Sequence, residues 1–305
     1  MDKNRQQFEQ ELERLLAPDQ IRKEEALSRH TTFRVGGPAE YLITPQIAQI
    51  PDVVALCRQH EIPLTVIGNG SNLLVSDNGL RGVVLELGKT ASGIRLLDGE
   101  DLVVQAGTLL SETANYAAKN GLSGMEFAAG IPGSLGGAVV MNAGAYGGEM
   151  KDILSGVRVL TTAGEIRVRP ADELDLSYRH SRMMDEGEIV LEARLNLTQG
   201  SEIVIRANMD ELRKKRIEKQ PLEYPSAGST FKRPQGYFAG KLIEDAGLRG
   251  FRIGDAQVSE KHCGFVINRG AATAAQILEL MQRVQERVKE HSGVDLEPEV
   301  RLLGF

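Results

Sequence analysis

Two glycine-rich stretches of this sequence have the composition of a backbone that binds an anion. The first, "GNGSN" at residues 68–72, follows the apolar run "LTVI". A tight turn there presents several backbone N–H groups and three polar side chains, which together suit a pyrophosphate. The alternative is a plain turn between a strand and a loop, and this motif alone favours that alternative.

The second stretch shifts the balance. It runs from Gly130 to Gly148 with seven glycines in nineteen residues and no charged residue, so backbone amides would have to hold any bound anion. Glycine lets a backbone approach a ligand closely, and the apolar side chains between the glycines could pack against an aromatic ring. The alternative is a packed turn inside the core. Two such loops in one chain favour a large nucleotide cofactor.

Two familiar nucleotide-binding motifs do not match these stretches. "GVVLELGKT" has five residues between Gly82 and Gly88, whereas a P-loop has four, and the intervening residues are typical of a strand. "VIGNGSNLLV" carries Leu73 where a dinucleotide fingerprint has its third glycine. The sequence therefore predicts neither a P-loop nor an ordinary Rossmann site.

Composition excludes several classes of protein. The 305-residue chain has a net charge of −6, which argues against binding to nucleic acid or an anionic membrane. Cys57 and Cys263 lie far apart in sequence, so we expect neither a disulfide framework nor a metal site, and a reducing cytosol fits best. Residues 1–30 are too charged for a signal peptide, and no apolar run is long enough for membrane insertion. We expect a cytoplasmic enzyme or binding protein.

Strands that alternate with helices must position these loops. We expect helices over 2–16, 47–62, 111–121 (with Gly121 as C-cap), 201–220 and 239–250, and a long one with Ile277, Met281, Val284 and Val288 on one face. We expect strands over 64–68, 82–87, 101–107, 187–197, 263–268 and 299–305, and two within 154–169 joined at "TTAG". A boundary near residue 200 separates an N-terminal helical segment (1–30) and a cofactor domain (31–200) from a substrate domain (201–305).

With these segments in hand, the chain resembles the UDP-N-acetylenolpyruvoylglucosamine reductase (UDP-N-acetylmuramate dehydrogenase) family. Seven motifs occur in order between Thr31 and Phe305: "TTFRVGGPAEY", "IGNGSNLLVSD", "AGIPGSLGGAVVMNAGAYGGEM", "SYRHSR", "PSAGSTFKRP", "AGKLIEDAGLRG" and "EPEVRLLGF". The resemblance implies a mixed α/β (α+β) chain. Its FAD-binding domain would have the vanillyl-alcohol-oxidase-like fold in two α/β subdomains, and a C-terminal α+β substrate domain would follow.

The resemblance also implies the cofactor and its site. FAD would lie between the two glycine loops, and NADPH would be a co-substrate. The residues it assigns to the cofactor are Arg34, Gly68, Asn69, Gly70, Ser71, Asn72, Leu73, Gly130, Ile131, Gly133, Ser134, Gly136, Gly137, Asn142, Gly144 and Ala145.

The family reaction supplies roles for three further residues. The implied substrate is UDP-N-acetylglucosamine enolpyruvate, which is reduced to UDP-N-acetylmuramate for peptidoglycan precursor synthesis. Ser229 matches the proton donor to C2, Arg179 matches an arginine that holds the substrate carboxylate, and Glu299 matches a third catalytic residue. By type and position alone, these are an ordinary loop serine, a surface ion-pair arginine and a loop acid. The choice of Glu299 over Glu297 rests on the resemblance.

Basic residues near these positions are candidates for the substrate diphosphate. Lys219 and Lys232 are the main ones, and Tyr178 and Arg233 are weaker candidates. Residues 213–216 are better explained as a solvated helix face. Two other functions remain open: a flavin oxidase of the same fold, and a nucleotide-sugar-binding protein without catalysis. An oxidase often tethers FAD through histidine, and none of the five histidines lies in a glycine loop. We expect a monomer or a weak oligomer.

Overall fold

The computed structural model describes residues 3–97 and 99–305, which form two compact units. Unit 1 comprises the chain up to Lys23, Tyr41–Asn69 and Gly82–Lys215, and unit 2 comprises Glu24–Glu40, Gly70–Arg81 and Arg216–Phe305. These units do not coincide with the three stretches predicted as domains (1–30, 31–200 and 201–305), because two short segments from the N-terminal third belong to unit 2. The domain boundaries themselves stay a prediction.

The N-terminal part of the chain contains two helices and a four-stranded sheet. Helices α1 (Lys3–Leu15) and α2 (Ile50–Gln59) accompany strands β1 (Ile21–Ala26), β2 (Pro38–Ile43), β3 (Leu64–Ile67) and β5 (Leu80–Glu86). The strand order is β1-β2-β5-β3, and β3 and β5 are parallel. Phe8 and Leu12 recur at helical spacing on α1 and are both buried, which confirms the N-terminal helix.

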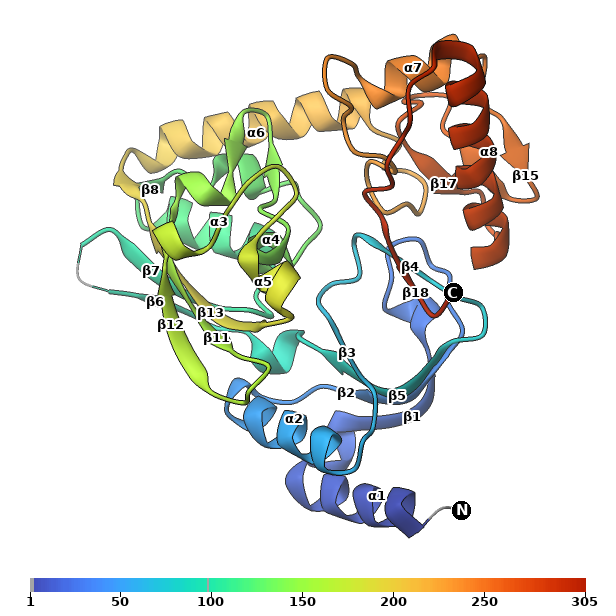
Figure 1. The fold of residues 1–305 in the computed structure, drawn as a ribbon. Helices are drawn as coiled ribbons and strands as arrows, with labels where there is room; N and C mark the ends of the chain where they lie inside the picture. Colours follow the sequence, from blue (N-terminus) through green and yellow to red (C-terminus); the bar gives the residue numbers. More distant parts are fainter. Residues whose placement is uncertain (1–2, 98) are drawn as a thin grey trace. The chain divides into compact units, whose positions relative to one another are not determined.

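Unit 1 also contains a five-stranded antiparallel sheet in the order β12-β11-β13-β7-β6. Its strands are β6 (Ile94–Leu96), β7 (Asp101–Gln105), β11 (Leu154–Leu160), β12 (Ile166–Pro170) and β13 (Ile189–Asn196). The pair β11 and β12 confirms the two strands predicted around "TTAG". Helices α3 (Leu110–Lys119) and α4 (Leu135–Val140) lie on one side of this sheet (Figure 1). Gly121 follows α3 with φ +66°, the left-handed conformation that suits glycine after a helix.

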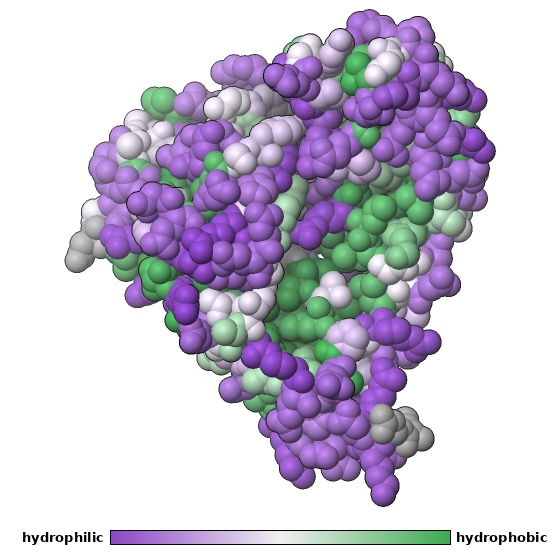
Figure 2. Space-filling view, in the orientation of Figure 1, coloured by the Kyte–Doolittle hydropathy of each residue, from purple (hydrophilic) through white to green (hydrophobic). Residues whose placement is uncertain are grey.

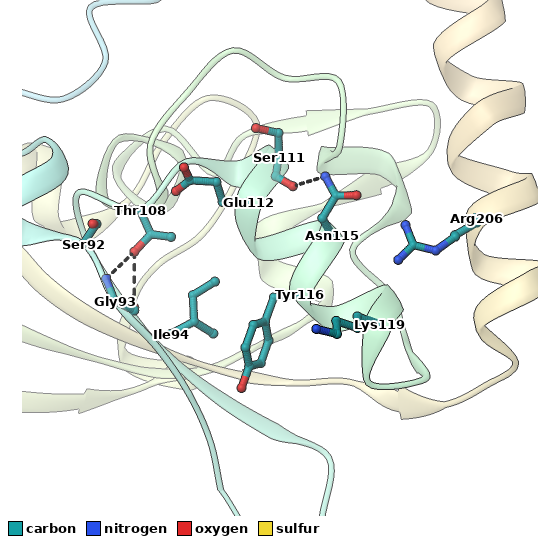
Figure 3. Close-up of a pocket in the computed structure, with 10 residues that line it drawn as sticks. All are labelled: Ser92, Gly93, Ile94, Thr108, Ser111, Glu112, Asn115, Tyr116, Lys119 and Arg206. Carbon is teal, nitrogen blue, oxygen red and sulfur yellow. Dashed lines mark hydrogen bonds between the residues drawn. The ribbon is translucent and has the colours of Figure 1, made fainter.

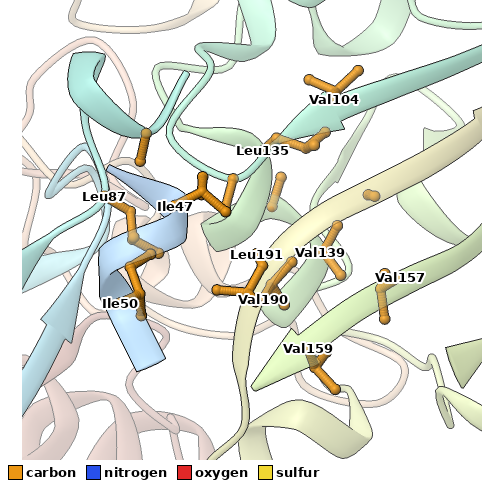
Figure 4. Packing of buried hydrophobic residues seen from close by; sticks show 14 of the residues in the cluster. Ile47, Ile50, Leu87, Val104, Leu135, Val139, Val157, Val159, Val190 and Leu191 are labelled. Carbon is orange, nitrogen blue, oxygen red and sulfur yellow. The ribbon is translucent and has the colours of Figure 1, made fainter. Parts of the chain in front are cut away.

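The sequence predicted a loop for the glycine-rich stretch at residues 130–148. This prediction is wrong, because the stretch contains a helix and two short strands. It contains α4 and a hairpin of β9 (Gly144–Ala145) and β10 (Gly148–Glu149). Glycine disfavours helices, but Leu135 and Val139 of α4 are fully buried in the core with Val190 and Leu191 of β13 (Figure 4). Tertiary packing therefore overrides the local propensity.

Short elements complete unit 1. They are β8 (Leu122–Ser123), which pairs with β14 (Thr198–Gln199), and α5 (Arg182–Glu186). The long helix α6 (Glu202–Lys219) follows β14 and ends before Pro221, as predicted, and the division between the units falls within it. Among the described residues, no helix combines the length and apolar character needed to span a membrane.

Unit 2 has an α+β arrangement. Strands β15 (Arg252–Ile253), β16 (Ala256–Val258) and β17 (Val266–Asn268) form an antiparallel sheet with helices α7 (Ala239–Asp245) and α8 (Ala274–Ser292). Strand β18 (Arg301–Leu303) runs parallel to β4 (Leu73–Val75), so the last residues of the chain pair with the segment after the first glycine loop. The four predicted apolar positions of α8 are all buried. Hydrophilic side chains cover most of the molecular face shown in Figure 2.

Candidate active site

The two glycine loops meet within unit 1. Gly68 follows β3, and a Cβ atom built on it would lie 2.4 Å from Oγ of Ser134. The side chain of Asn69 donates a hydrogen bond to the carbonyl of Pro132 (2.7 Å). Residues 68–69 therefore pack directly against residues 132–134, and only glycine fits at position 68 without displacing Ser134.

The remainder of the first loop belongs to unit 2, where it packs against the turn that carries Arg34. Gly70 has φ +60°, and its added Cβ would lie 1.9 Å from the carbonyl oxygen of His30. The amide of Thr32 donates to the carbonyl of Gly70 (3.2 Å). Arg34 is exposed and itself has φ +56°. Ser71 and Asn72 are half-buried, and Leu73 begins β4.

Each of these two regions contains a buried hydroxyl that lacks a protein partner. Within the described part of the chain, Oγ of Ser134 and Oγ1 of Thr32 are buried and form no hydrogen bond. A buried polar atom without a partner is costly, so each hydroxyl has hydrogen-bonding capacity that a bound group could use. Oγ of Ser134 lies in the second glycine-rich stretch, where it fits a bound phosphate-bearing cofactor, and Oγ1 of Thr32 lies in the turn that packs against Gly70.

Neighbouring glycines of α4 differ in what surrounds them. Gly136 is buried, and its added Cβ would lie 2.8 Å from Cβ of Ala106. Gly137 is exposed, and its added Cβ would have only Oγ of Ser134, at 3.8 Å, within reach. Packing within the protein thus explains Gly136 but leaves open space at Gly137, as expected if a ligand covers that face.

The other predicted cofactor residues lie around α4. Gly130 is exposed, Ile131 packs on the core, and the carbonyl of Gly133 accepts from the amide of Leu110 (2.9 Å). Gly144 and Ala145 form β9, where a Cβ on Gly144 would lie 2.7 Å from Cβ of Glu149.

Arg179 sits at the tip of a tight turn in unit 1. Ser177 and His180 exchange two backbone hydrogen bonds of 3.2 Å across this turn, and Arg179 has φ +57°. Its Nη2 donates to the carbonyl of Gly144 (3.4 Å), and its guanidinium lies 5.3 Å from the ring of the exposed Tyr178. The arginine therefore lies beside the glycine-rich segment that the sequence predicted for the cofactor.

The imidazole of His180 makes two further contacts at the same turn. Its Nε2 lies 2.9 Å from Oδ2 of Asp185, and its Nδ1 lies 3.2 Å from the carbonyl of Asp175. The hydrogen bond to Asp185, and after it the one to the backbone of Asp175, raises the pKa of His180 above its usual value.

Ser229 and Glu299 lie on paired segments of unit 2. The amide of Glu299 donates to the carbonyl of Thr230 (2.9 Å), and Phe231 and Pro298 form an isolated antiparallel β-bridge. Ser229 is exposed, and Gly228 beside it has φ +77° with no neighbour within 4 Å of an added Cβ. The two predicted catalytic residues of unit 2 are thus brought together with open space beside Ser229.

The first glycine loop is also hydrogen-bonded to the segment that contains Glu299. The side chain of Asn72 donates to the carbonyl of Glu299 (2.9 Å), and the amide of Arg301 donates to the carbonyl of Asn72 (3.0 Å). Within unit 2, Asn72 and Glu299 are therefore adjacent although 227 residues separate them in sequence.

The two candidate acids differ in their surroundings. The carboxylate of Glu297 forms an ion pair with Nζ of Lys232 (2.5 Å), and both groups are partly exposed. Glu297 thus has a structural partner in Lys232, and the choice of Glu299 for the chemistry stays a prediction. Of the other predicted substrate residues, Lys219 is exposed at the end of α6, and Arg233 stacks on the ring of Phe238 at 3.9 Å.

A separate groove of about 580 Å³ in unit 1 contains none of the predicted site residues (Figure 3). Tyr116 and Lys119 of α3 and Arg206 of α6 line it. Arg206 is already paired with Glu202. The groove is therefore a feature distinct from the candidate site.

Sequence reasoning missed the contacts that fix Arg179. Asn142 was predicted as a cofactor contact, but its side chain bonds to the carbonyl of Ser177, and the hydroxyl of Ser181 bonds to the carbonyl of Val140. No local pattern reveals bonds across 35 or 41 residues. Their only trace in the sequence is an asparagine and a serine in glycine-poor parts of two motifs.

Comparisons with known proteins identify the class and then the family. Residues 38–169 match the family model described as "FAD binding domain", so the chain is a flavoprotein with FAD as its cofactor. An alkyldihydroxyacetonephosphate synthase structure, at 14% identity and a TM-score of 0.51 over 97% of this chain and 60% of that one, shares the fold. The mixed α/β fold class is therefore confirmed.

Residues 220–303 match the model described as "UDP-N-acetylenolpyruvoylglucosamine reductase, C-terminal domain". A reductase of that name from Agathobacter rectalis is 56% identical over 293 residues, covering 92% of this chain and 93% of the relative. The crystal structure of UDP-N-acetylenolpyruvylglucosamine reductase from Thermus caldophilus matches with a TM-score of 0.80 and 40% identity over 93% of this chain and 99% of that one. The chain belongs to the UDP-N-acetylenolpyruvoylglucosamine reductase family, whose members are oxidoreductases.

Proposed function

We propose that this protein reduces UDP-N-acetylglucosamine enolpyruvate to UDP-N-acetylmuramate with NADPH, in peptidoglycan precursor synthesis in the cytoplasm. The observation that carries the proposal is 56% identity to a reductase of this name over more than nine-tenths of both chains. The chemistry supplied by bound FAD is hydride transfer, first from NADPH and then from flavin N5 to C3 of the enolpyruvyl group. The chain's own residues must hold the substrate, stabilise charge and deliver a proton.

Ser229 is the proposed proton donor to C2. After hydride reaches C3, negative charge develops at C2 and spreads into the carboxylate, so a proton must arrive at C2 to complete the reduction. A serine hydroxyl is a weak acid, and it therefore acts only if it is placed close to the carbon. The exposed position of Ser229 and the empty space around Gly228 support this role.

Arg179 and Glu299 are proposed to handle the carboxylate. The planar guanidinium of Arg179 can donate two parallel hydrogen bonds to a carboxylate and stabilise the charge that spreads into it. Glu299 would act in its neutral form, since two like charges in one site oppose each other. Lys219, Lys232, Tyr178 and Arg233 are proposed to bind the remainder of the substrate. Lys232 would exchange Glu297 for the diphosphate.

The residues proposed to hold FAD are those of the two glycine loops, together with Arg34. The partnerless hydroxyls of Ser134 and Thr32 and the open face of Gly137 support this assignment. NADPH is proposed to use the same site before the sugar nucleotide enters it.

The test follows flavin absorbance without oxygen. NADPH should bleach the flavin of the purified protein, and the enolpyruvyl sugar nucleotide should then restore the colour. Recovery only on admission of oxygen would instead identify a flavin oxidase.

Ser229→Ala provides the residue-level test. We expect NADPH to bleach this variant as fast as the wild type, whereas recovery with substrate slows by roughly 100-fold or more, the usual contribution of a positioned proton donor. Ser226→Ala, in the same segment but without an assigned role, is the matched control. Equal recovery rates in Ser229→Ala and the wild type would remove Ser229 from the mechanism.

A further inference from the structure

The buried side chain of Asn142 joins the glycine-rich segment to the turn that carries Arg179. Asn142 is 1% exposed and has φ +40°. Its Nδ2 donates to Oε2 of Glu149 (2.7 Å) and to the carbonyl of Ser177 (3.0 Å). Its Oδ1 accepts from the amide of Lys151 (2.9 Å). Both amide protons are therefore committed to the protein.

The bond to Ser177 acts on the arginine at short range. The carbonyl of Ser177 lies two residues before Arg179, in the turn closed by the backbone bonds between Ser177 and His180. Any displacement of Ser177 therefore moves the base of the arginine side chain.

A second bond fixes the other side of the turn to the same segment. Ser181 is completely buried, and its hydroxyl donates to the carbonyl of Val140 (2.7 Å). The turn is thus held on both sides of Arg179 by residues 140–142, immediately after α4. The backbone of α4 is the predicted cofactor-facing segment, so one rigid connection sets the arginine against it.

Only an asparagine satisfies all the partners at this position. The site presents a carboxylate oxygen and a carbonyl oxygen, which need two N–H donors, and a backbone N–H, which needs an acceptor. Aspartate offers no donor and would place a second negative charge beside Glu149. Asparagine also tolerates the left-handed backbone that position 142 adopts.

We propose that Asn142 is a positioning residue, whose amide fixes the Arg179 turn to the cofactor-facing segment and so sets the arginine for the substrate carboxylate. This inference rests on the proposed function, because it gives Arg179 its task. The side chain of Asn142 then holds the turn that carries Arg179, and only the backbone of Asn142 is left for the predicted contact with FAD.

Two variants test the proposal. Asn142→Gly removes the side chain but accepts the same backbone conformation, and Asn142→Asp keeps the shape without the donors. In both, we expect NADPH to reduce the flavin at a rate within 3-fold of the wild type, because that step does not need the arginine. Reoxidation by the enolpyruvyl sugar nucleotide should slow by about 10–100-fold. Glu149→Gln keeps an acceptor for Asn142 and is the matched control, with both rates unchanged.

Hydrogen–deuterium exchange supplies a readout that does not depend on turnover. In Asn142→Gly, amides of residues 174–182 should exchange at least 10-fold faster than in the wild type, while peptides from α8 stay unchanged. In an Arg179→Lys background, adding Asn142→Gly should slow reoxidation less than 2-fold further, because both changes remove the same contact.

The outcomes separate this inference from the proposed function. Wild-type reoxidation in Asn142→Gly, or unchanged exchange in residues 174–182, would overturn the inference and leave the reductase intact. Loss of flavin with equal slowing of both half-reactions would show a merely structural role and would overturn it too. If the wild type itself fails to recover with substrate, the proposed function fails, and the exchange experiment still decides whether Asn142 holds the turn.

Discussion

Replacement of Gly137 by alanine tests whether the cofactor explains the glycine. The added methyl group meets no protein atom closer than Oγ of Ser134 at 3.8 Å, an ordinary contact distance. Alanine is favoured over glycine in a helix interior by about 0.5–1 kcal/mol. The FAD-free protein should therefore be as stable as the wild type or gain up to about 1 kcal/mol, which raises Tm by roughly 2–4 °C.

Cofactor affinity should change in the opposite direction. If FAD packs against the exposed face of α4, the methyl group occupies space that the cofactor needs. We expect at least 10-fold weaker FAD binding, which corresponds to about 1.4 kcal/mol. Flavin fluorescence during titration of the FAD-free protein measures the affinity, and calorimetry of the same sample measures Tm.

Gly136→Ala is the matched comparison one residue away. Its methyl group would lie 2.8 Å from Cβ of Ala106, so it overpacks the core and should cost about 1–3 kcal/mol of stability without FAD. Wild-type FAD affinity in Gly137→Ala would show that Gly137 does not face the cofactor. A destabilised FAD-free Gly137→Ala protein would refute the reasoning about open space.

Two further predictions concern titration. NMR should find the pKa of His180 above that of a peptide histidine, and Asp185→Asn should lower it, because the hydrogen bond that His180 donates to Asp185 is the main cause of the shift. Since the folded-state pKa is the higher one, this interaction stabilises the turn fully below the unfolded-state pKa and is lost as pH rises through the folded value. Amide protection factors near His180, which correct the exchange rates for the intrinsic rate at each pH, would contradict this if they were higher at pH 8 than at pH 6. Burial raises the pKa of Cys57 to about 12 and also raises that of Cys263, so neither thiol should react with a thiol reagent at pH 8 until the protein unfolds. Fast labelling of the native protein would contradict their burial.

Local patterns in the sequence predicted the regular elements well. Helix α8 has its buried face at the expected spacing, and its ends carry recognisable signals. The hydroxyl of Thr273 accepts from the amide of Gln276 at the start, and Gly293 adopts φ +73° after the end. The carboxylate of Asp77, from a distant loop, accepts from two further amides at the start of α8, which no local pattern shows.

Pairing between distant segments accounts for what the sequence did not reveal. Strand β4 pairs with β18, and Asn72 bonds to the backbone of Glu299 across 227 residues. Composition could not show this either, because "GNGSN" indicates a turn, with or without a bound pyrophosphate, and not the segment that the turn contacts. The same reason applies to α4, whose helical state depends on burial of Leu135 and Val139 against strands more than 30 residues away.

Backbone conformation links the candidate residues in a way that the sequence alone cannot. Seven non-glycine residues in the described part of the chain have positive φ, and three of them, Arg34, Asn142 and Arg179, are residues predicted for the site. Each such conformation costs about 1–2 kcal/mol for a residue with a Cβ atom, so it persists only where other contacts enforce it. At Arg179 those contacts are the bonds of Ser177 and Ser181 to residues 140–142. An arginine needed only for a surface ion pair would not require a strained backbone held by the buried side chains of Asn142 and Ser181, so the strain itself supports a role for Arg179 in which its exact position matters.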